Sequence, residues 1–366
     1  MKIFSLFLPQ FYETKENNEW WGEGFTEWTN VKNAKSLRKG QVQPLHPLND
    51  NYYNMLDKST MEWQTSLMHK YGLYGMIYYH YYFNGKLLLE KPAENLLRWK
   101  DIDQPFFFCW ANHTWYRSWE GSKKVLVEQT YGDKSDWKRH FDYLLPFFKD
   151  DRYEKADNMP LFMIYDSQTD ATIIDDMFYW FDHWGKEAGF GGIKCIRECF
   201  HYPAEEEMNR YKNNDLMFLA QPSCGRWALE DRSLFSHYLN KMKFRLSSKG
   251  YFKRPPVIDG NRLYKYMILK EKQILSKKFI PGIFFGWDNT PRHKNRGFII
   301  DCVEKRRFFE YMDIIKQSDY LFVNAWNEWA EGMVMEPSEE YGYRNLKWIK
   351  EWIDRQISND NENSDN

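Results

Sequence analysis

The sequence lacks a long apolar run and a marked excess of charge of either sign. No segment approaches the roughly 18 uninterrupted apolar residues of a membrane-spanning helix, and the formal net charge is −1. The opening stretch, MKIFSLFLPQF, is too short in apolar residues for a signal peptide and is expected to be a first strand. These absences argue against a transmembrane segment, a nucleic-acid partner and a polybasic membrane patch, and they predict a cytoplasmic protein.

Cysteine is also scarce, with five residues at positions 109, 195, 199, 224 and 302. An odd number scattered over so long a chain does not form a disulfide framework, so reduced thiols are expected. Cys195 and Cys199 make a CxxxC pattern, but a zinc site would need two further ligands, and His201 is the only near candidate. The sequence therefore predicts no metal and no other cofactor.

Eight short apolar runs recur along the chain, and no GxGxxG or phosphate-binding loop follows any of them. Most runs are continuous rather than alternating, which is typical of parallel strands buried on both faces. The runs cover residues 2–8, 75–83, 105–111, 161–165, 192–196, 216–221, 282–287 and 320–326. The missing glycine motif makes a doubly wound open sheet the weaker alternative.

Helix signals stand between these runs. Ser59 and Glu62 form a capping box before apolar residues at helical spacing, and the same spacing recurs in 135–148, 173–184 and 304–317. Alternating strands and helices predict a single-domain (β/α)8 TIM barrel over residues 1–350, with extended βα loops. Residues 223–280 are expected to carry an extra helix or lid, and 351–366 the end of a C-terminal helix followed by a disordered polar tail.

Aromatic residues are abundant, with 17 Trp, 25 Tyr and 27 Phe. Most should fill the core, but indole and phenol rings also stack on the C–H faces of sugars. The segments 8–31, 78–86, 110–121, 286–292 and 324–332 follow predicted strands and mix Trp or Tyr with polar side chains. In a barrel these segments meet on one face, so they predict a pocket for an oligo- or polysaccharide.

Each segment alone also has a structural interpretation. Glu27 would serve as a helix cap or local ion-pair partner, His80 as a core histidine, and Asp288 as the first residue of a turn. Only their coincidence on one face of the predicted barrel favours the functional interpretation.

The eighth run ends in NAWNEWAEG, where Glu328 and Glu331 stand three residues apart. Two glutamates in a first helical turn would also stabilise the helix dipole by about 0.3–1 kcal/mol each. If the chain leaves strand geometry near Trp326, however, the two carboxyl groups become neighbours. Paired carboxyl groups flanking one bond are the usual apparatus of glycoside cleavage, so this pair predicts a catalytic site.

A family resemblance covers nearly the whole chain, from Leu8 to about Tyr343. It is carried by LPQF, EWWGEGFTEWTNV, YYHYYFNGK, CWAN, PLFMIY, GWDNTPR and FVNAWNEWAEG. The chain resembles the WbsX-type proteins of bacterial surface-polysaccharide loci, which are related to the endo-α-mannosidase family of glycoside hydrolases. That family is named a glycosyltransferase, but its likeness to the mannosidases implies a hydrolase barrel.

The resemblance implies roles for individual residues. Glu328 would take the proton of the sugar 2-hydroxyl, giving a 1,2-anhydro sugar with overall retention, and Glu331 would be general acid and then general base. The positions expected to line sugar subsites are Trp21, Glu27, Tyr79, His80, Trp110, Asn112, Trp287, Asp288 and Asn327. Two positions depart from the family pattern: His113 stands where an acid is usual, and Tyr12 where a histidine is usual.

Three functions stay open on the sequence. The first is a retaining α-glycoside hydrolase or transglycosidase acting on a bacterial surface polysaccharide or its precursor. The second is a nucleotide-sugar glycosyltransferase of O-antigen or capsule biosynthesis, for which Asp101 and Asp103 form a DxD on the opposite face of the predicted barrel. The third is a non-catalytic carbohydrate-binding barrel, suggested by His113. The oligomeric state is not predicted.

Overall fold

The computed structural model describes residues 1–117, 124–166, 171–204, 206, 215–222, 238–239, 242, 245–247, 249–251, 253–274 and 277–364. Its main sheet is parallel along the path β12-β10-β9-β8-β4-β2-β1-β16-β13. These strands are β1 (Lys2–Phe7), β2 (Gly75–Phe83), β4 (Phe106–Trp110), β8 (Met159–Ile164), β9 (Lys194–Cys199), β10 (Leu216–Leu219), β12 (Phe279–Ile280), β13 (Gly282–Ile283) and β16 (Tyr320–Val323). All eight predicted strand segments overlap strands of this path.

The two ends of the path meet in one piece of chain, because only Pro281 separates β12 from β13. Phe279 pairs with Met217 of β10, and Gly282 pairs with Phe322 of β16. Proline has no N–H to donate, so the ladder is interrupted at this point. The predicted seventh strand therefore begins earlier than expected and is split, and the sheet forms a near-closed barrel.

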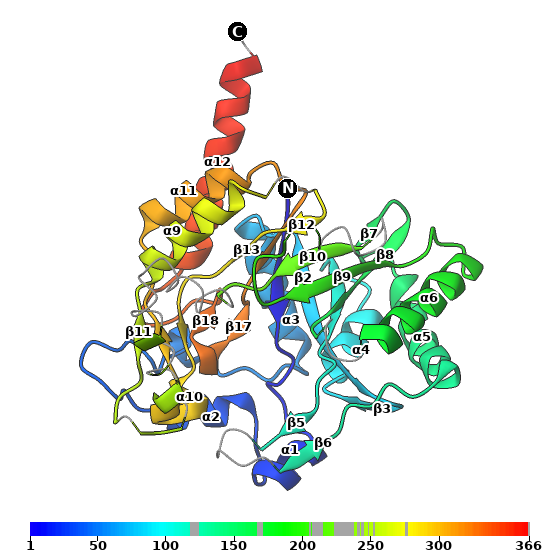
Figure 1. Ribbon diagram of the computed structural model, residues 1–366, viewed down its shortest axis with the longest axis horizontal. Helices are drawn as coiled ribbons and strands as arrows, with labels where there is room; N and C mark the ends of the chain where they lie inside the picture. The colour runs from blue at the N-terminus through cyan, green and yellow to red at the C-terminus, as the bar shows by residue number, and fades with distance from the viewer. Residues whose placement is uncertain are drawn as a thin grey trace.

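Helices cover the outside of the barrel, as the sequence predicts (Figure 1). They are α3 (Lys58–Lys70), α4 (Lys91–Arg98), α5 (Lys134–Phe148), α6 (Ala171–Glu187), α9 (Gly260–Glu271), α11 (Lys305–Ile315) and α12 (Arg344–Ser364). Helix α3 begins one residue before the predicted capping box, with Asp57 at its N-cap. The fold is thus a single-domain (β/α)8 barrel.

Short elements lie in the loops of the barrel, most of them in the loops that follow the strands. The helical ones are α1 (Lys15–Trp21), α2 (Glu27–Asn33), η1 (Leu48–Asp50), α10 (Thr290–His293), η4 (Lys294–Arg296) and η5 (Trp329–Glu331). The extended ones are β3 (Lys86–Leu88), β5 (Trp115–Tyr116), β6 (Val125–Val127), β7 (Lys155–Ala156), β11 (Val257–Ile258), β14 (Trp287–Asp288), β15 (Ile299–Ile300), β17 (Asn327–Glu328) and β18 (Met333–Val334).

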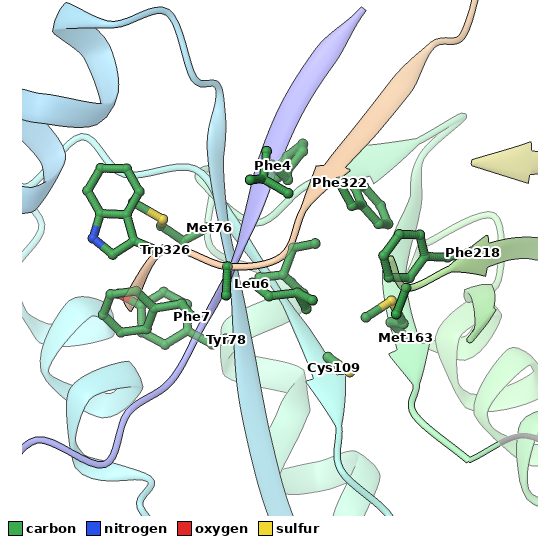
Figure 2. Close-up of a cluster of buried hydrophobic side chains, with 14 of the residues drawn as sticks. Phe4, Leu6, Phe7, Met76, Tyr78, Cys109, Met163, Phe218, Phe322 and Trp326 are labelled. Carbon is green, nitrogen blue, oxygen red and sulfur yellow. The ribbon is translucent and has the colours of Figure 1, made fainter. Parts of the chain in front are cut away.

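Strand parity decides which side chains face the barrel interior. Successive side chains of a strand point to opposite faces. Phe4 and Phe322 pack together inside, with ring centroids 6.3 Å apart, whereas Phe7 packs on Tyr78 at 4.5 Å on the outer face. Figure 2 shows this core, with Phe218 beside Phe322 in the interior group. Apolar rings fill the barrel interior at the level of Phe4 and Phe322. The polar groups of the interior lie at the carboxyl ends of the strands.

Two predicted segments differ from expectation or lie partly outside the described residues. Much of 223–252 is outside them, and the rest of 223–280 contains α9, which belongs to the ring of barrel helices.

Helix α12 reaches Ser364, further into the polar C-terminal segment than expected, and Figure 1 shows its end projecting from the body. Buried Leu346, Ile349 and Trp352 anchor its first half. Within the part of the chain that the structure describes, no helix has the length and apolarity to span a bilayer.

Candidate active site

A cavity of about 400 Å³ opens at the carboxyl ends of the barrel strands. Five of the predicted site residues line it: Trp21, Tyr79, Trp287, Glu328 and Glu331. They come from the loop after β1, from β2, from the loop after β13 and from the loop after β16. The structure therefore brings together side chains that are more than 300 positions apart in the sequence.

The loop that carries the two glutamates leaves the barrel strand β16 after Val323, but it turns later than the sequence predicts, because residues 327 and 328 form the short strand β17. Glu328 ends β17 and Glu331 ends the 3-10 turn η5, after which Gly332 adopts the left-handed conformation at φ 66°. A glycine tolerates this conformation without steric cost, and β18 then pairs back onto β17. This tight hairpin places both carboxyl groups on the cavity side. Figure 1 shows β17 and β18 close to α2 and α10.

One guanidinium group holds three glutamates together. Arg292 donates from Nη2 to Glu328 Oε2 at 2.8 Å, from Nη1 to Glu331 Oε1 at 2.5 Å, and from Nε to Glu27 Oε1 at 2.8 Å. Its side chain is only 9% exposed. Because buried charges are stable only when paired, this cluster is both a structural anchor and the electrostatic centre of the site.

The two cavity glutamates have different environments. Burial, together with the charges of Glu331 and Glu27, raises the pKa of Glu328 to about 8, against the lowering effect of Arg292. The second oxygen of Glu331 also accepts the indole N–H of Trp287 at 2.9 Å. Glu331 thus accepts hydrogen bonds from two N–H donors, one on each carboxyl oxygen. With a pKa of about 8, Glu328 holds a proton near neutral pH.

A fourth acid, Glu336, fixes the loop that carries the pair. Its Oε1 accepts from Trp326 and Gln64, and its Oε2 accepts from Trp329 and Tyr53, at 2.7–2.9 Å. Burial raises the pKa of Glu336 to about 7, while the four donors lower it. The tryptophans on either side of Glu328 are thus tied to one carboxyl group beneath the site.

Three predicted site residues do not line the cavity but position residues that do. Glu27 is fully buried and binds Arg292. Asp288 accepts from the backbone and hydroxyl of Thr290, at the start of the short helix that carries Arg292. Asn327 exchanges two hydrogen bonds with the backbone of Leu8, at 2.8 and 3.1 Å, and so joins the eighth strand's loop to the first strand.

The remaining predicted site residues, His80, Trp110 and Asn112, lie away from the cavity because of strand parity and loop packing. His80 pairs with Trp110 in the β2–β4 register, and both point outward, where they pack on His140 of α5. His80 Nε2 lies 2.8 Å from His140 Nε2, which fits its alternative interpretation as a core histidine. Asn112 binds the backbone N–H and C=O of Asp166 and joins two loops.

Several cavity residues were not predicted as site residues. Arg292 is the last residue of the GWDNTPR motif. A single arginine in a polar loop does not indicate that its side chain will bind three carboxyl groups. Tyr81 follows Tyr79 at the same parity, Tyr165 directly follows β8, and Glu198 is the last residue but one of β9. Of the two departures from the family pattern, His113 lines the cavity, where burial lowers its pKa, and Tyr12 is buried outside the lining.

The sequence patterns considered for metals lie elsewhere. Asp101 is paired with Lys58, and Asp103 is near His69, in the loop before β4 and hence opposite the cavity. Cys109, Cys195, Cys199 and Cys302 are free thiols, and Cys224 lies outside the described residues. Among the residues described, no three His, Cys, Asp or Glu side chains form a group that could hold a metal ion.

Comparisons with known proteins agree with this fold. A solved GH99 endo-alpha-mannosidase from Bacteroides thetaiotaomicron, in complex with Bis-Tris propane, superposes with a TM-score of 0.55 at 12% identity, covering 97% of this chain and 98% of that one. A solved glycoside hydrolase-like protein gives 0.57 at 11% identity, covering 96% and 93%. At these identities the likeness concerns the fold.

Sequence comparison gives the closer relationship. The uncharacterized protein WxcX of Xanthomonas campestris pv. campestris is 28% identical over 363 residues, or 96% of this chain. The chain spans about half the length of that relative, 50%. The model of the family described as Glycosyltransferase WbsX matches residues 3–349. The chain therefore belongs to the WbsX family.

Proposed function

We propose that this protein is a retaining α-glycoside hydrolase or transglycosidase that acts on a bacterial surface polysaccharide or its precursor. The observation that carries the proposal is the pair Glu328 and Glu331, which face one aromatic-lined cavity and share the guanidinium of Arg292. Trp21, Tyr79 and Trp287 supply the apolar platforms and polar edges that sugar rings need. The barrel shared with endo-alpha-mannosidases supports a glycosidase over a nucleotide-sugar transferase.

The proposed reaction has two steps. Glu328 takes the proton of the sugar 2-hydroxyl, whose oxygen bonds to C1 while the C1–oxygen bond to the leaving group breaks. Glu331 gives its proton to that leaving oxygen. The resulting 1,2-anhydro sugar is then opened at C1 by water or an acceptor hydroxyl, which loses its proton to Glu331 as Glu328 returns a proton to O2. Two inversions at C1 give retention.

The proposed base, Glu328, is not ionised near neutral pH, although the first step requires it to be. Glu328 is the protonated partner near neutral pH, and Glu331 is bound by Arg292 and Trp287. Catalysis therefore requires the proton to reside on Glu331 when the substrate is in place. A sugar that approaches Glu331 with its glycosidic oxygen displaces solvent there and competes with Arg292 for the carboxyl group, which favours this redistribution.

A nucleotide-sugar glycosyltransferase is the second candidate, because the family carries that description. Its DxD lies at the opposite end of the barrel from the cavity, with Asp101 already paired to Lys58. Metal-dependent binding of a nucleotide sugar, measured by calorimetry, would support it. The cytoplasmic location expected from the sequence stays a prediction.

The test is incubation of the purified protein with α-linked manno-oligosaccharides and with its host's surface polysaccharide. Products would be identified by mass and by the anomeric NMR signal of the first-formed product. We expect cleavage or transfer with retention, and its loss in Glu331→Gln. Unchanged cleavage by Glu331→Gln would refute the proposal, as would an inverted product. Tight binding without turnover would favour the carbohydrate-binding alternative.

A further inference from the structure

Glu336 lies beneath the hairpin that carries the two cavity glutamates, and the proposed reaction gives it no step. It is only 3% exposed and does not line the cavity. Its Oε1 accepts from the amide of Gln64 at 2.7 Å and from the indole of Trp326 at 2.9 Å. Its Oε2 accepts from the hydroxyl of Tyr53 at 2.9 Å and from the indole of Trp329 at 2.8 Å. Each oxygen therefore has two donors, and all four are uncharged groups.

The hydrogen-bond polarity around Glu336 is fixed. An indole N–H and an amide nitrogen only donate, whereas a hydroxyl group donates or accepts. The hydroxyl of Tyr53 is bonded to Glu336 and also accepts from the amide nitrogen of Asn327 at 3.3 Å. That amide is oriented by the backbone of Leu8, whose N–H donates to Asn327 Oδ1 and whose C=O accepts from Nδ2. Of the two groups bonded to the Tyr53 hydroxyl, Glu336 is thus the one that accepts its proton.

Four donors on two oxygens match an ionised carboxyl group. A protonated carboxyl group would have to donate from one oxygen, at which two donors already point. Burial opposes ionisation and raises the pKa of Glu336 to about 7, while the four donors favour the charged form. Above pH 7 the structure therefore holds a buried negative charge beneath the cavity, stabilised by four hydrogen bonds.

These bonds hold the segment that carries the reactive pair. Trp326 and Trp329 lie on either side of Glu328, and both indoles bind the same carboxyl group. The backbone C=O of Trp326 also accepts from the N–H of Glu336 at 3.2 Å. The hairpin is thus closed on itself through Glu336, and Glu328 and Glu331 lie within the closed segment.

We propose that Glu336 is a positioning residue, whose negatively charged carboxyl group holds Glu328 and Glu331 in the geometry that glycoside cleavage requires. The inference deepens the proposed function and rests on it. It differs from a role in packing, because it depends on which atoms donate and which accept. Glutamine has nearly the shape of glutamate, but at this position its amide nitrogen would face an N–H donor in either orientation.

One orientation of the amide in Glu336→Gln is the less unfavourable. With its nitrogen at the Oε2 position, it would face Trp329 and Tyr53. With its nitrogen at the Oε1 position, it would face Trp326 and Gln64. The amide of Gln64 can turn over and accept, since its own Oε1 is buried without a hydrogen-bond partner in the described part of the chain. The remaining conflict is with the indole N–H of Trp326.

The test is steady-state kinetics above pH 7, on a glycan that the wild-type protein cleaves, with Glu336→Gln, Trp326→Phe and the double variant. We expect Glu336→Gln to lower kcat by about tenfold and to leave KM within about twofold, because the cavity keeps its lining. Trp326→Phe alone should lower kcat by about three- to tenfold. The double variant lacks the conflicting N–H, so its kcat should exceed that of Glu336→Gln by about threefold.

Glu271→Gln is the matched control for the change of a partly buried carboxyl group to an amide. Glu271 accepts from the hydroxyl groups of Tyr202 and Tyr311, at 3.3 and 2.9 Å, and it lies outside the cavity. Hydroxyl groups can turn and accept from an amide, unlike the indole donors of Glu336. Glu271→Gln should therefore keep the wild-type kcat and KM.

Tyr53→Phe is a milder variant, for the case in which Glu336→Gln does not fold. It removes one donor to Glu336 and should lower kcat by about three- to tenfold, with KM unchanged. Its control is Tyr153→Phe. The hydroxyl of Tyr153 is also buried and donates to the C=O of Leu161 at 2.7 Å, but Tyr153 precedes β8, at the end of the barrel opposite the cavity. Tyr153→Phe should lose stability and keep its kcat.

The outcomes separate this inference from the proposed function. Wild-type kcat in folded Glu336→Gln or in Tyr53→Phe would overturn the role of Glu336, as would a double variant no more active than Glu336→Gln. In each of these cases, cleavage of the glycan by the wild-type protein leaves the proposed function intact. Absence of cleavage by the wild-type protein would overturn both.

Discussion

The indole N–H of Trp287 donates to Oε2 of Glu331 at 2.9 Å. The ring packs on Phe298 with centroids 4.4 Å apart, and Trp287 pairs with Ile300 in a small sheet beside the cavity. The indole is therefore fixed independently of the loop that carries Glu331. Glu331, in the loop after β16, is thus oriented by Trp287, which lies in the loop after the neighbouring strand β13.

Trp287→Phe tests this bond, because phenylalanine keeps a ring and loses the N–H. A hydrogen bond to a charged group is worth about 1.5–3 kcal/mol, so we expect kcat to fall by roughly ten- to a hundredfold. Steady-state kinetics on a cleaved glycan would measure it. Trp352→Phe is the matched control, since it removes an indole–carboxylate bond to Asp313 at the surface helix α12 and should not change kcat. Wild-type kcat in Trp287→Phe would contradict the prediction.

Arg292→Met removes the counter-charge of two buried glutamates, Glu27 and Glu328, and of the partly buried Glu331. We expect the free energy of unfolding to fall by about 3–5 kcal/mol, the usual cost of breaking a buried ion pair. Arg292→Lys should restore part of this stability but not the activity, because one ammonium group cannot bind three carboxyl groups as a guanidinium fork does. Urea unfolding and kinetics would be measured on both variants.

Arg197→Lys is the control for this pair of substitutions. Arg197 is also buried and binds two aspartates, but it faces the helices outside the barrel. The control should lose stability and keep its kinetic constants. Full activity of Arg292→Lys would show that Arg292 serves stability alone.

The pH dependence should follow Glu328. As the base, Glu328 must be ionised, and its pKa of about 8 includes a raising contribution from the charge of Glu331. Glu331→Gln removes that charge, so the pKa of Glu328 should fall below about 8. An activated aryl glycoside needs no proton from Glu331, and its cleavage by this variant should rise with pH and level off below pH 8. A rate that falls as pH rises over this range would exclude Glu328 as the base.

Tyr79 and His80 offer a test of strand parity, since they are adjacent and point to opposite faces of β2. Tyr79→Phe removes a hydroxyl group from the cavity and should raise KM by about three- to tenfold, with little change in stability. His80→Phe removes the contact with His140 and should lower the free energy of unfolding by about 1–3 kcal/mol, leaving KM unchanged. A large KM effect in His80→Phe would contradict this placement.

The stability of the wild-type protein should also depend on pH through His80. Burial lowers the pKa of His80 to about 3, below the unfolded value of about 6.5. The contribution of neutral His80 is therefore present above pH 6.5 and is lost as pH falls from there toward 3. His80→Phe should show a shallower acid loss in thermal unfolding scans.

The barrel was predictable because buried parallel strands are continuous apolar runs. The seventh strand was less so, because its two halves on either side of Pro281 are only two residues each. Two residues are too few to show the hydrophobic pattern of a strand. The same continuity hid the orientation of β2, where GMIYYHYYF is apolar on both faces, so nothing in it separates the inward Tyr79 from the outward His80.

The candidate site was predictable only in part. Glu328 and Glu331 stand out because two acids follow the apolar run of the eighth strand. Trp287 stands out because it comes at the end of the apolar run of the seventh strand. Arg292 does not stand out, because its importance comes from burial and from partners distant in sequence. The family resemblance implies sugar contact for Asn327 and Asp288, whereas in the structure their side chains bind backbone groups next to the cavity.

The split at Pro281 makes one short segment the seam of the barrel. It joins β10 and β16 through only two paired residues on each side. The chain that leaves this seam carries Trp287 and Arg292, the two residues that hold Glu331. Local opening of this segment would be measured as fast amide hydrogen exchange at residues 279–283. It would weaken the contacts of Trp287 and Arg292 with Glu331 without unfolding the other strands. The segment that closes the barrel therefore also positions the side chains that bind Glu331.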